Sequence, residues 1–200
     1  VMQVASAEGY VRDPELVIDF YNERRKQLLD VEPNAGHTGL AELEKDFNVT
    51  VVTQNVDNLH ERAGSTHVIH LHGELTKVCS SRDPYNPRYV RELKPEEYEV
   101  KMGDKAGDGS QLRPFIVWFG EAVPEIETAI GYVEKADIFV IIGTSMNVYP
   151  AAGLLNYVPR TAEVYLIDPK PVDTHSMRQI HVIQKGASEG VKELKTEILH

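Results

Sequence analysis

The side chains best suited to chemistry are those of His70 and His72, because an imidazole with an ordinary pKa of about 6.5 can take up or release a proton near neutral pH. They lie at the end of the apolar run HVIHL (67–71), which predicts a strand. Alternate residues of a strand face the same side, so the two rings point the same way unless the strand ends between them. Three interpretations stay open: a catalytic base, metal ligands completed by His60 or Asp57, and histidines without a chemical role.

Polar clusters directly follow four of the predicted strands, namely TQNVDNLH (53–60), HLHGE (70–74), GTSMNVYP (143–150) and IDP (167–169). In a doubly wound sheet the carboxyl ends of the strands lie along one edge, where nucleotides bind. The turn Gly143-Thr144-Ser145 offers backbone amides and hydroxyls to phosphate or ribose. Asp168 stands where a carboxylate accepts hydrogen bonds from a ribose diol, although aspartate is also a common turn residue.

The elements that must position these residues alternate along the chain. Hydrophobic spacing predicts helices over 13–29, 34–46, from Pro124, 151–157 and 188–199, and strands over 49–53, 67–71, 115–119, 137–143, 163–168 and 181–184. The near-continuous apolar runs 115–119 and 137–143 are predicted to be buried parallel strands. This alternation predicts an α/β fold, a Rossmann-like doubly wound parallel sheet.

One stretch interrupts the alternation. Residues 74–114 are polar and rich in proline, glycine and charge, which predicts a small inserted module, with 1–73 and 115–200 forming the Rossmann-like domain. The single cysteine, Cys79, excludes an intramolecular disulfide and a zinc site built from several cysteines. A net charge of -10 argues against binding to nucleic acid or anionic membranes. With no signal peptide or long apolar segment, a cytoplasmic protein is expected.

The motifs together resemble one family. TQNVDNLHERAG (53–64), VIHLHGEL (68–75), FIVWFGE (115–121) and GTSMNVYPAA (143–152), in this order, closely resemble the sirtuins, and the resemblance covers essentially the whole chain. It implies a Rossmann-type domain with a small insertion and NAD-dependent removal of acyl groups from protein lysines, giving nicotinamide and O-acyl-ADP-ribose.

The resemblance also implies roles for individual residues. His72 matches the general base, and Val117 and Phe119 lie near the acyl-lysine tunnel. The residues implied to bind NAD are Gln54, Asn55, Asp57, Gly143, Thr144, Ser145, Asp168 and Ala187.

A tyrosine and an arginine three residues apart, Tyr21 and Arg24, lie on one face of the predicted helix 13–29. The pair resembles the sirtuin subclass that accepts succinyl- or malonyl-lysine, in which the two side chains bind the distal carboxylate. The plainer alternative places Tyr21 in the apolar stripe of the helix and Arg24 in solvent or in an ion pair with a nearby glutamate.

Three departures from the family pattern matter. Nothing in residues 1–12 matches the first strand and the glycine-rich loop that cradles pyrophosphate, so weak NAD binding is expected of the chain as written. Only Cys79 stands where the family usually has two CxxC pairs, so no zinc is expected. Asp168 replaces the usual asparagine. The alternatives are therefore a catalytically silent nucleotide-binding module and a metal-dependent hydrolase built on His60, His70, His72 and Asp57. The sequence does not predict the oligomeric state.

Overall fold

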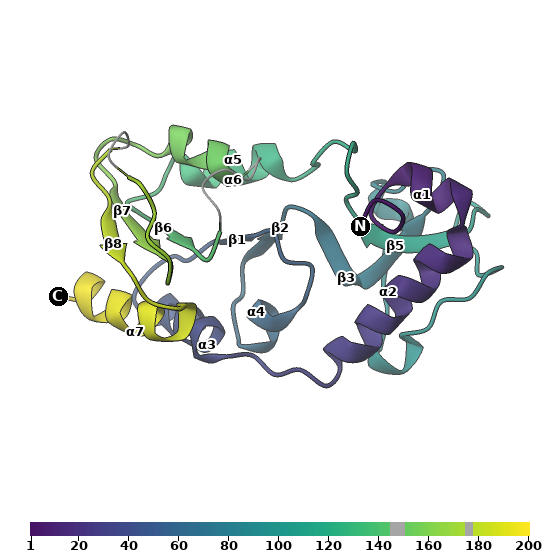
Figure 1. The fold of residues 1–200 in the computed structure, drawn as a ribbon, viewed down its shortest axis with the longest axis horizontal. Helices are drawn as coiled ribbons and strands as arrows, with labels where there is room; N and C mark the ends of the chain where they lie inside the picture. The colour runs from purple at the N-terminus through teal and green to yellow at the C-terminus, as the bar shows by residue number, and fades with distance from the viewer. Residues whose placement is uncertain (145–150, 175–177) are drawn as a thin grey trace. The chain divides into compact units, whose positions relative to one another are not determined.

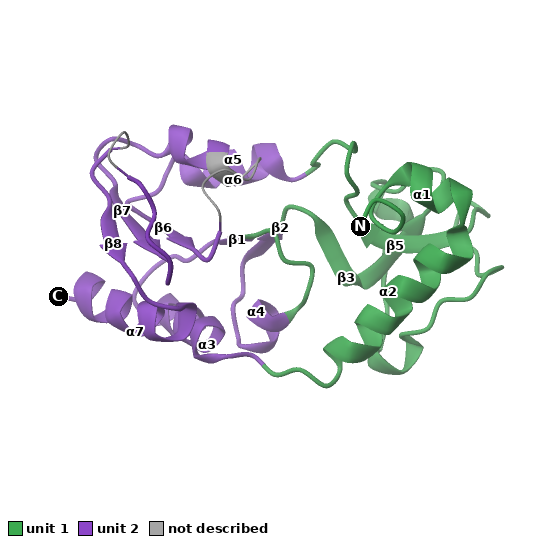
Figure 2. Ribbon diagram, in the orientation of Figure 1, with its two compact units in different colours: residues 1–32, 53–58, 70–124 green, residues 33–52, 59–69, 125–200 purple. Residues whose placement is uncertain are grey.

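The computed structural model describes residues 1–144, 151–174 and 178–200. The chain forms two compact units (Figure 2). Unit 1 comprises Val1–Glu32, Thr53–Asn58 and His70–Pro124, and unit 2 comprises Pro33–Val52, Leu59–Ile69 and Glu125–His200. The boundaries of these two units differ from those of the Rossmann-like domain and the inserted module predicted from the sequence. The domain and module boundaries stay a prediction.

Unit 1 combines two helices with a small antiparallel sheet. Its elements are α1 (Ala7–Arg12), α2 (Pro14–Leu28), β3 (Gly73–Ser80), η2 (Pro87–Tyr89), β4 (Arg91–Glu92), η3 (Pro95–Glu97) and β5 (Leu112–Ile116), with the strands in the order β4-β3-β5. The predicted helix 13–29 is confirmed as α2, which begins where the Asp13 carboxylate accepts a hydrogen bond from the Leu16 amide. Its buried residue Ile18 packs with Val78 of β3, Leu112 of β5 and their neighbours.

The prediction of a buried parallel strand over 115–119 is wrong. The strand β5 ends at Ile116 and pairs antiparallel with β3, which lies inside the segment predicted to be irregular. Beyond Ile116 the chain turns, because the Glu121 amide donates to the Trp118 carbonyl. A buried apolar run can belong to a strand of either direction, since the direction depends on the partner. Here the partner is β3, whose mixed polar and apolar sequence gives little sign of a strand.

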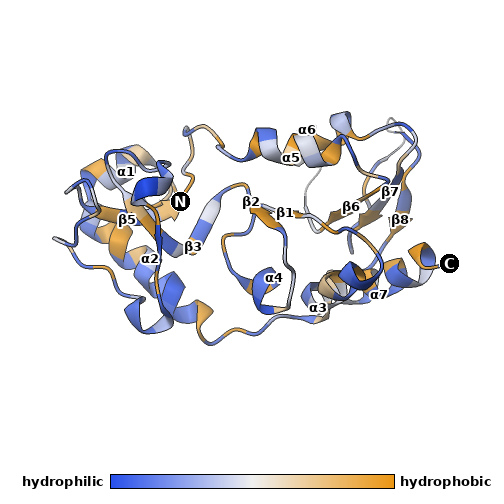
Figure 3. Ribbon diagram, turned by 180° about the vertical axis from the view of Figure 1, so that it is seen from behind, coloured by the Kyte–Doolittle hydropathy of each residue, from blue (hydrophilic) through white to orange (hydrophobic). Residues whose placement is uncertain are grey.

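Unit 2 contains a parallel sheet covered by helices (Figure 1). Its elements are α3 (Ala35–Glu42), η1 (Leu43–Lys45), α4 (Leu59–Arg62), α5 (Ile126–Val133), β6 (Ile138–Ile142), α6 (Ala151–Leu154), η4 (Leu155–Tyr157), β7 (Glu163–Ile167), β8 (His181–Ile183) and α7 (Ala187–Ile198), with strand order β6-β7-β8. Figure 3 shows hydrophobic and hydrophilic residues alternating along α7. Its apolar residues Val191 and Leu194 are buried with Ile167 of β7, so this sheet confirms the expected parallel α/β pattern.

Two short strands, β1 (Val51–Thr53) and β2 (Val68–His70), form a further sheet. They confirm the strands expected near 49–53 and 67–71. None of the helices in the described ranges is long and apolar enough to cross a membrane.

Candidate active site

The polar clusters after β1 and β2 come together in unit 1. The His70 ring nitrogen Nδ1 lies 3.0 Å from the backbone oxygen of Asn55, and the Leu75 amide donates to the Val56 carbonyl at 2.7 Å. The Nε2 atom of the buried His70 lies 3.9 Å from the Glu74 carboxylate. The His70 ring and the Leu75 amide thus hold the backbone at Asn55 and Val56.

His72 has a different environment from His70. Its side chain is half-buried, and its ring makes no hydrogen bond to any residue in the described part of the chain. Burial lowers the pKa of His72 below its ordinary value, because desolvation disfavours the charged imidazolium. The ring is thus held neutral, with a nitrogen lone pair available to accept a proton near neutral pH.

The backbone beside His72 requires the glycine that follows it. Gly73 has φ +88°, and a Cβ atom there would lie 2.1 Å from the Phe115 carbonyl oxygen. A larger residue would push β3 away from β5. The Val117 amide donates to the His72 carbonyl at 2.9 Å, so the backbone at His72 is held next to the segment after β5.

The other residues of the QNxD motif lie on the same loop. The Asn55 side chain is exposed, and its backbone amide donates to Thr53 Oγ1 at 3.0 Å. Gln54 and Asp57 are half-buried. Because His70 holds the Asn55 carbonyl, the amide and carboxylate side chains of this loop stand on a backbone that is already ordered.

The segment after β5 alternates between the two sides of the chain. Val117 is half-buried and Phe119 is 64% exposed, whereas Trp118 between them is 2% exposed. The Phe119 amide donates to the Ala5 carbonyl at 3.0 Å, which anchors this segment to the residues before α1. An exposed phenylalanine on an anchored backbone is an apolar surface available to a ligand.

A buried ion pair holds the inner side of the same segment. The Arg113 guanidinium lies 3.2 Å from the Glu121 carboxylate and stacks on the Trp118 ring at 3.8 Å. Glu121 also accepts hydrogen bonds from the Trp118 amide and the Tyr85 hydroxyl, each at 2.8 Å. This network was not predicted from the sequence. The sequence shows Arg113 in an otherwise apolar run and Glu121 eight residues later. This pattern does not indicate that the two side chains form an ion pair.

The predicted acyl-binding pair is divided between the core and the surface. Tyr21 is 6% exposed, and its hydroxyl accepts a hydrogen bond from Trp118 Nε1 at 3.2 Å. Burial raises the pKa of Tyr21, so the phenol stays protonated. Arg24 is exposed, donates to Gln27 Oε1 at 3.0 Å and lies over the Phe20 ring at 4.8 Å. No direct contact joins Tyr21 to Arg24 among the described residues.

The candidate nucleotide-binding residues that the structure describes in unit 2 gather at the carboxyl edge of its parallel sheet. The Gly143 amide donates to the Ile167 carbonyl, and the Asp168 amide donates to the Ile183 carbonyl. Gly143 has φ +60° with open space where a Cβ would stand, so a ligand can approach its backbone. Thr144 follows it, and Ala187 begins α7. Ser145 lies outside the described residues. Backbone amides, a carboxylate and a helix start at one sheet edge fit a nucleotide.

Comparison with known proteins identifies the family. The model of the Sir2 family matches residues 1–150. The chain belongs to the Sir2 family. It is 84% identical over 195 residues to an NAD-dependent protein deacylase of Bacteroides thetaiotaomicron, which covers 98% of this chain and 83% of the relative. It is 47% identical over 199 residues to an NAD-dependent protein deacylase of Helicobacter pylori strain 26695, covering 100% of this chain and 84% of that protein.

Solved structures support the same assignment. A crystal structure of a Sir2 homologue in complex with NAD aligns with a TM-score of 0.84 at 34% sequence identity, covering 98% of this chain and 77% of that one. The Rossmann-like fold expected from the sequence is therefore the Sir2 fold.

The residues of this Sir2 protein do not fit the zinc ion that the family's inserted domain usually holds. Cys79 is the only cysteine of the chain; it is buried, and its Sγ atom lies 3.7 Å from the Pro114 carbonyl oxygen. Burial raises the pKa of this thiol to about 12, so it stays protonated and is not a thiolate ligand. A closed zinc site needs four ligands, which a single neutral thiol does not provide.

A hydrogen-bonded cluster joins the two ends of the insertion next to Cys79. Asp108 accepts hydrogen bonds from the hydroxyls of Ser80 at 2.5 Å and Ser110 at 2.6 Å. These bonds, that of Ser110 first, lower the pKa of Asp108 to about 2, so the carboxylate stays ionised. Ser80 in turn accepts bonds from the amides of Arg82 and Asp83. Side-chain hydrogen bonds thus connect the two ends of the predicted insertion.

The structure does not assemble the metal-hydrolase alternative. Three ligand atoms must lie within reach of one ion for a metal to bind well. In the described part of the chain, His60, His72 and Asp57 belong to no such group; of the four predicted ligands only His70 belongs to a group of side chains that could hold a metal ion, and the other three are not in it.

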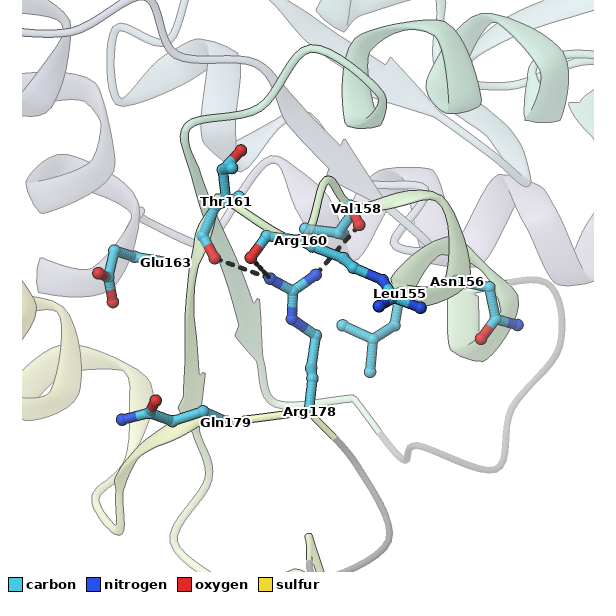
Figure 4. A pocket seen from close by; sticks show the side chains of 9 residues that line it. Leu155, Asn156, Val158, Arg160, Thr161, Glu163, Arg178 and Gln179 are labelled. Carbon is cyan, nitrogen blue, oxygen red and sulfur yellow. Dashed lines mark hydrogen bonds between the residues drawn. The ribbon is translucent and has the colours of Figure 1, made fainter.

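A pocket in unit 2, of about 560 Å³, contains none of the predicted site residues (Figure 4). The Arg178 guanidinium within it donates to the backbone carbonyls of Val158, Arg160 and Ala162 at 2.8–3.1 Å. These bonds use three of the five N–H donors of the guanidinium, and they fix the loop before β7.

Proposed function

We propose that this Sir2 protein, an NAD-dependent protein deacylase, releases nicotinamide and O-acyl-ADP-ribose as it removes acyl groups from protein lysines, and that it accepts succinyl and malonyl groups as well as acetyl. NAD supplies the ribose carbon that the acyl oxygen attacks as nicotinamide leaves. The observation that carries the proposal is the half-buried position of His72, whose ring makes no hydrogen bond to a described residue and whose backbone carbonyl accepts the Val117 amide.

His72 acts as the general base in this proposal and accepts the proton of a ribose hydroxyl. A base works best when its pKa lies near the working pH, because it is then largely unprotonated and still basic enough to take the proton. Asn55 orients the ribose and a water molecule, Gln54 lines the same region, and Asp57 holds the carboxamide of nicotinamide. The backbone order that His70 imposes on this loop supports such positioning.

Gly143, Thr144 and Ser145 bind phosphate and ribose in this proposal, with Asp168 at the adenosine ribose and Ala187 at the adenine. The exposed Gly143 backbone supports the first assignment. The Asp168 carboxylate, which accepts a hydrogen bond from the Lys170 amide at 2.8 Å, is half-exposed and can accept others.

The acyl-lysine lies along Val117 and Phe119 in the proposal, and the distal carboxylate of a succinyl or malonyl group binds Tyr21 and Arg24. The contacts of Arg24 support its proposed role in binding this carboxylate. Its guanidinium contacts a neutral amide and an aromatic ring, and no described carboxylate forms an ion pair with it. The charge is therefore available to a substrate carboxylate, which guanidinium binds in a charge-assisted geometry.

The experiment follows acetyl-lysine and succinyl-lysine peptides by mass spectrometry, with and without NAD and with and without a chelator. Loss of the acyl group only when NAD is present, unchanged by chelation, supports the proposal. Loss without NAD that chelation abolishes would establish the metal-dependent hydrolase. NAD binding with no loss of either acyl group would establish the silent module.

A further inference from the structure

Trp118 touches the proposed acyl-binding tyrosine from inside unit 1. We infer that Trp118 determines acyl specificity as a positioning residue: its indole N–H orients the Tyr21 hydroxyl so that the phenol proton is donated to the carboxylate of an acidic acyl group. This inference rests on the proposed function of Tyr21 in binding that carboxylate.

The direction of the hydrogen bond carries the argument. An indole nitrogen can only donate, so in the 3.2 Å contact between Trp118 Nε1 and Tyr21 Oη the tyrosine oxygen must accept. A phenol has one proton of its own, and no acceptor for it is found among the described residues. A buried hydroxyl with an uncommitted proton needs an acceptor, because a buried donor left without one is costly.

The indole cannot turn away from Tyr21. Arg113 stacks on one part of its ring at 3.8 Å, and the Tyr10 ring packs against it at 5.4 Å with a tilt of 35°. Glu121 accepts a hydrogen bond from the Trp118 backbone amide at 2.8 Å. With the side chain and backbone both fixed, the donor direction of Trp118 is set before any substrate arrives.

A distal carboxylate uses this arrangement and an acetyl group does not. A carboxylate oxygen accepts hydrogen bonds strongly, whereas the methyl group of acetyl offers no acceptor at that position. Because burial keeps Tyr21 protonated, its hydroxyl remains a donor to the anion throughout the physiological pH range. The indole N–H should therefore affect acidic acyl groups selectively.

The test is a double-mutant cycle on the ratio of kcat/KM for succinyl-lysine peptide to kcat/KM for acetyl-lysine peptide. Trp118→Phe keeps an aromatic ring and removes the N–H. It should lower the ratio by about 3 to 10-fold, the loss expected of one hydrogen bond. Tyr21→Phe should lower it at least as much, and Trp118→Phe should have no further effect in the Tyr21→Phe background.

The outcomes separate this inference from the proposed function. A ratio lowered by Tyr21→Phe but unchanged by Trp118→Phe, or effects of the two changes that simply add, would overturn the role of Trp118 and leave the acyl assignment intact. A ratio unchanged by both Tyr21→Phe and Arg24→Met would overturn the acyl assignment, and this inference with it.

A measurement on the unaltered protein tests the inference even if Trp118→Phe does not fold. Trp118 is the only tryptophan of the chain, so tryptophan emission reports this position alone. Succinyl-lysine peptide should change the emission more than acetyl-lysine peptide at saturation, because only its carboxylate engages the hydroxyl that the indole contacts. Equal changes with the two peptides would overturn the inference.

Discussion

The two units are stabilised in different ways. In unit 2, the parallel strands β6, β7 and β8 and the helix α7 bury an apolar cluster around Ile167 and Leu194. Unit 1 has an apolar cluster too, but polar groups join its elements: buried Arg113 binds Glu121, and buried Arg25 donates to the Leu75 and Tyr98 carbonyls. The proposed base and acyl-binding residues belong to unit 1.

This difference indicates how a reactive site is held. Hydrophobic packing is nondirectional, and a polar contact fixes a particular atom in a particular direction. The indole of Trp118, the carbonyl of Asn55 and the backbone of residues 117–121 are each fixed by such contacts. The candidate nucleotide-binding groups of unit 2 are mostly backbone groups at a sheet edge. Packing of the sheet is sufficient to position them.

The largest expected effect is on catalysis. His72→Ala should lower the rate of deacylation by roughly 10² to 10⁴-fold, the range typical of losing a general base. His70→Ala is the matched control, because its ring contacts the Asn55 carbonyl and is not the proposed base. Steady-state rates on one acyl-lysine peptide compare the two. A greater loss of rate in His70→Ala than in His72→Ala would show that His72 is not the base.

The next effect is on stability. Arg113→Met should lower the free energy of unfolding by about 3–5 kcal/mol, because it leaves Glu121 without its partner in a buried pair. Lys195→Met removes the ion pair with Glu42 in unit 2, whose carboxylate is exposed, and should cost much less, because solvent screens an exposed pair. Urea unfolding followed by circular dichroism measures both. Similar costs would show that the units do not differ as described.

The third effect separates two substrates. Arg24→Met should lower kcat/KM for succinyl-lysine peptide by about 10 to 100-fold, since a charge-assisted hydrogen bond contributes about 1.5–3 kcal/mol. Acetyl-lysine peptide has no distal charge and should be affected much less. Neighbouring Lys26→Met is a control for the loss of a positive charge on α2. Equal losses on both peptides would make Arg24 a structural residue.

A smaller effect concerns pH. The lowered pKa of His72 keeps the imidazole neutral down to a lower pH than an ordinary histidine. The rate should thus fall only as the pH drops through a midpoint below about 6.5, where protonation removes the base. A profile of kcat/KM against pH measures that midpoint. A midpoint at or above the ordinary histidine value would contradict the burial of the ring.

The smallest expected effect is that of chelation. Because Cys79 is a buried neutral thiol and Asp108 joins the ends of the insertion, a chelator should leave the melting temperature unchanged. Asp108→Ala should lower it, since Ser80 and Ser110 lose their acceptor. Differential scanning calorimetry compares the two treatments. A lower melting temperature after chelation would reveal a stabilising metal.

Local patterns in the sequence were sufficient to predict the elements that depend on them. Asp13 and Pro14 mark the start of α2, and the apolar run at 138–142 forms β6. The polar insertion was harder, because β3 becomes a strand only through its partner β5, more than thirty residues away. The same holds within the site: the motif around His72 was visible in the sequence, whereas the meeting of Arg113 with Glu121 depends on how the chain folds back.

The central claim, that His72 is the base of an NAD-dependent deacylation, is tested most directly in a single turnover of His72→Ala. The departure of nicotinamide precedes the step in which the base acts, so the variant should release nicotinamide while the deacylated peptide forms roughly 10² to 10⁴ times more slowly than in the unaltered protein. Both products are quantified from one reaction by mass spectrometry. Deacylated peptide appearing at the unaltered rate, or nicotinamide release lost to the same extent, would contradict the claim.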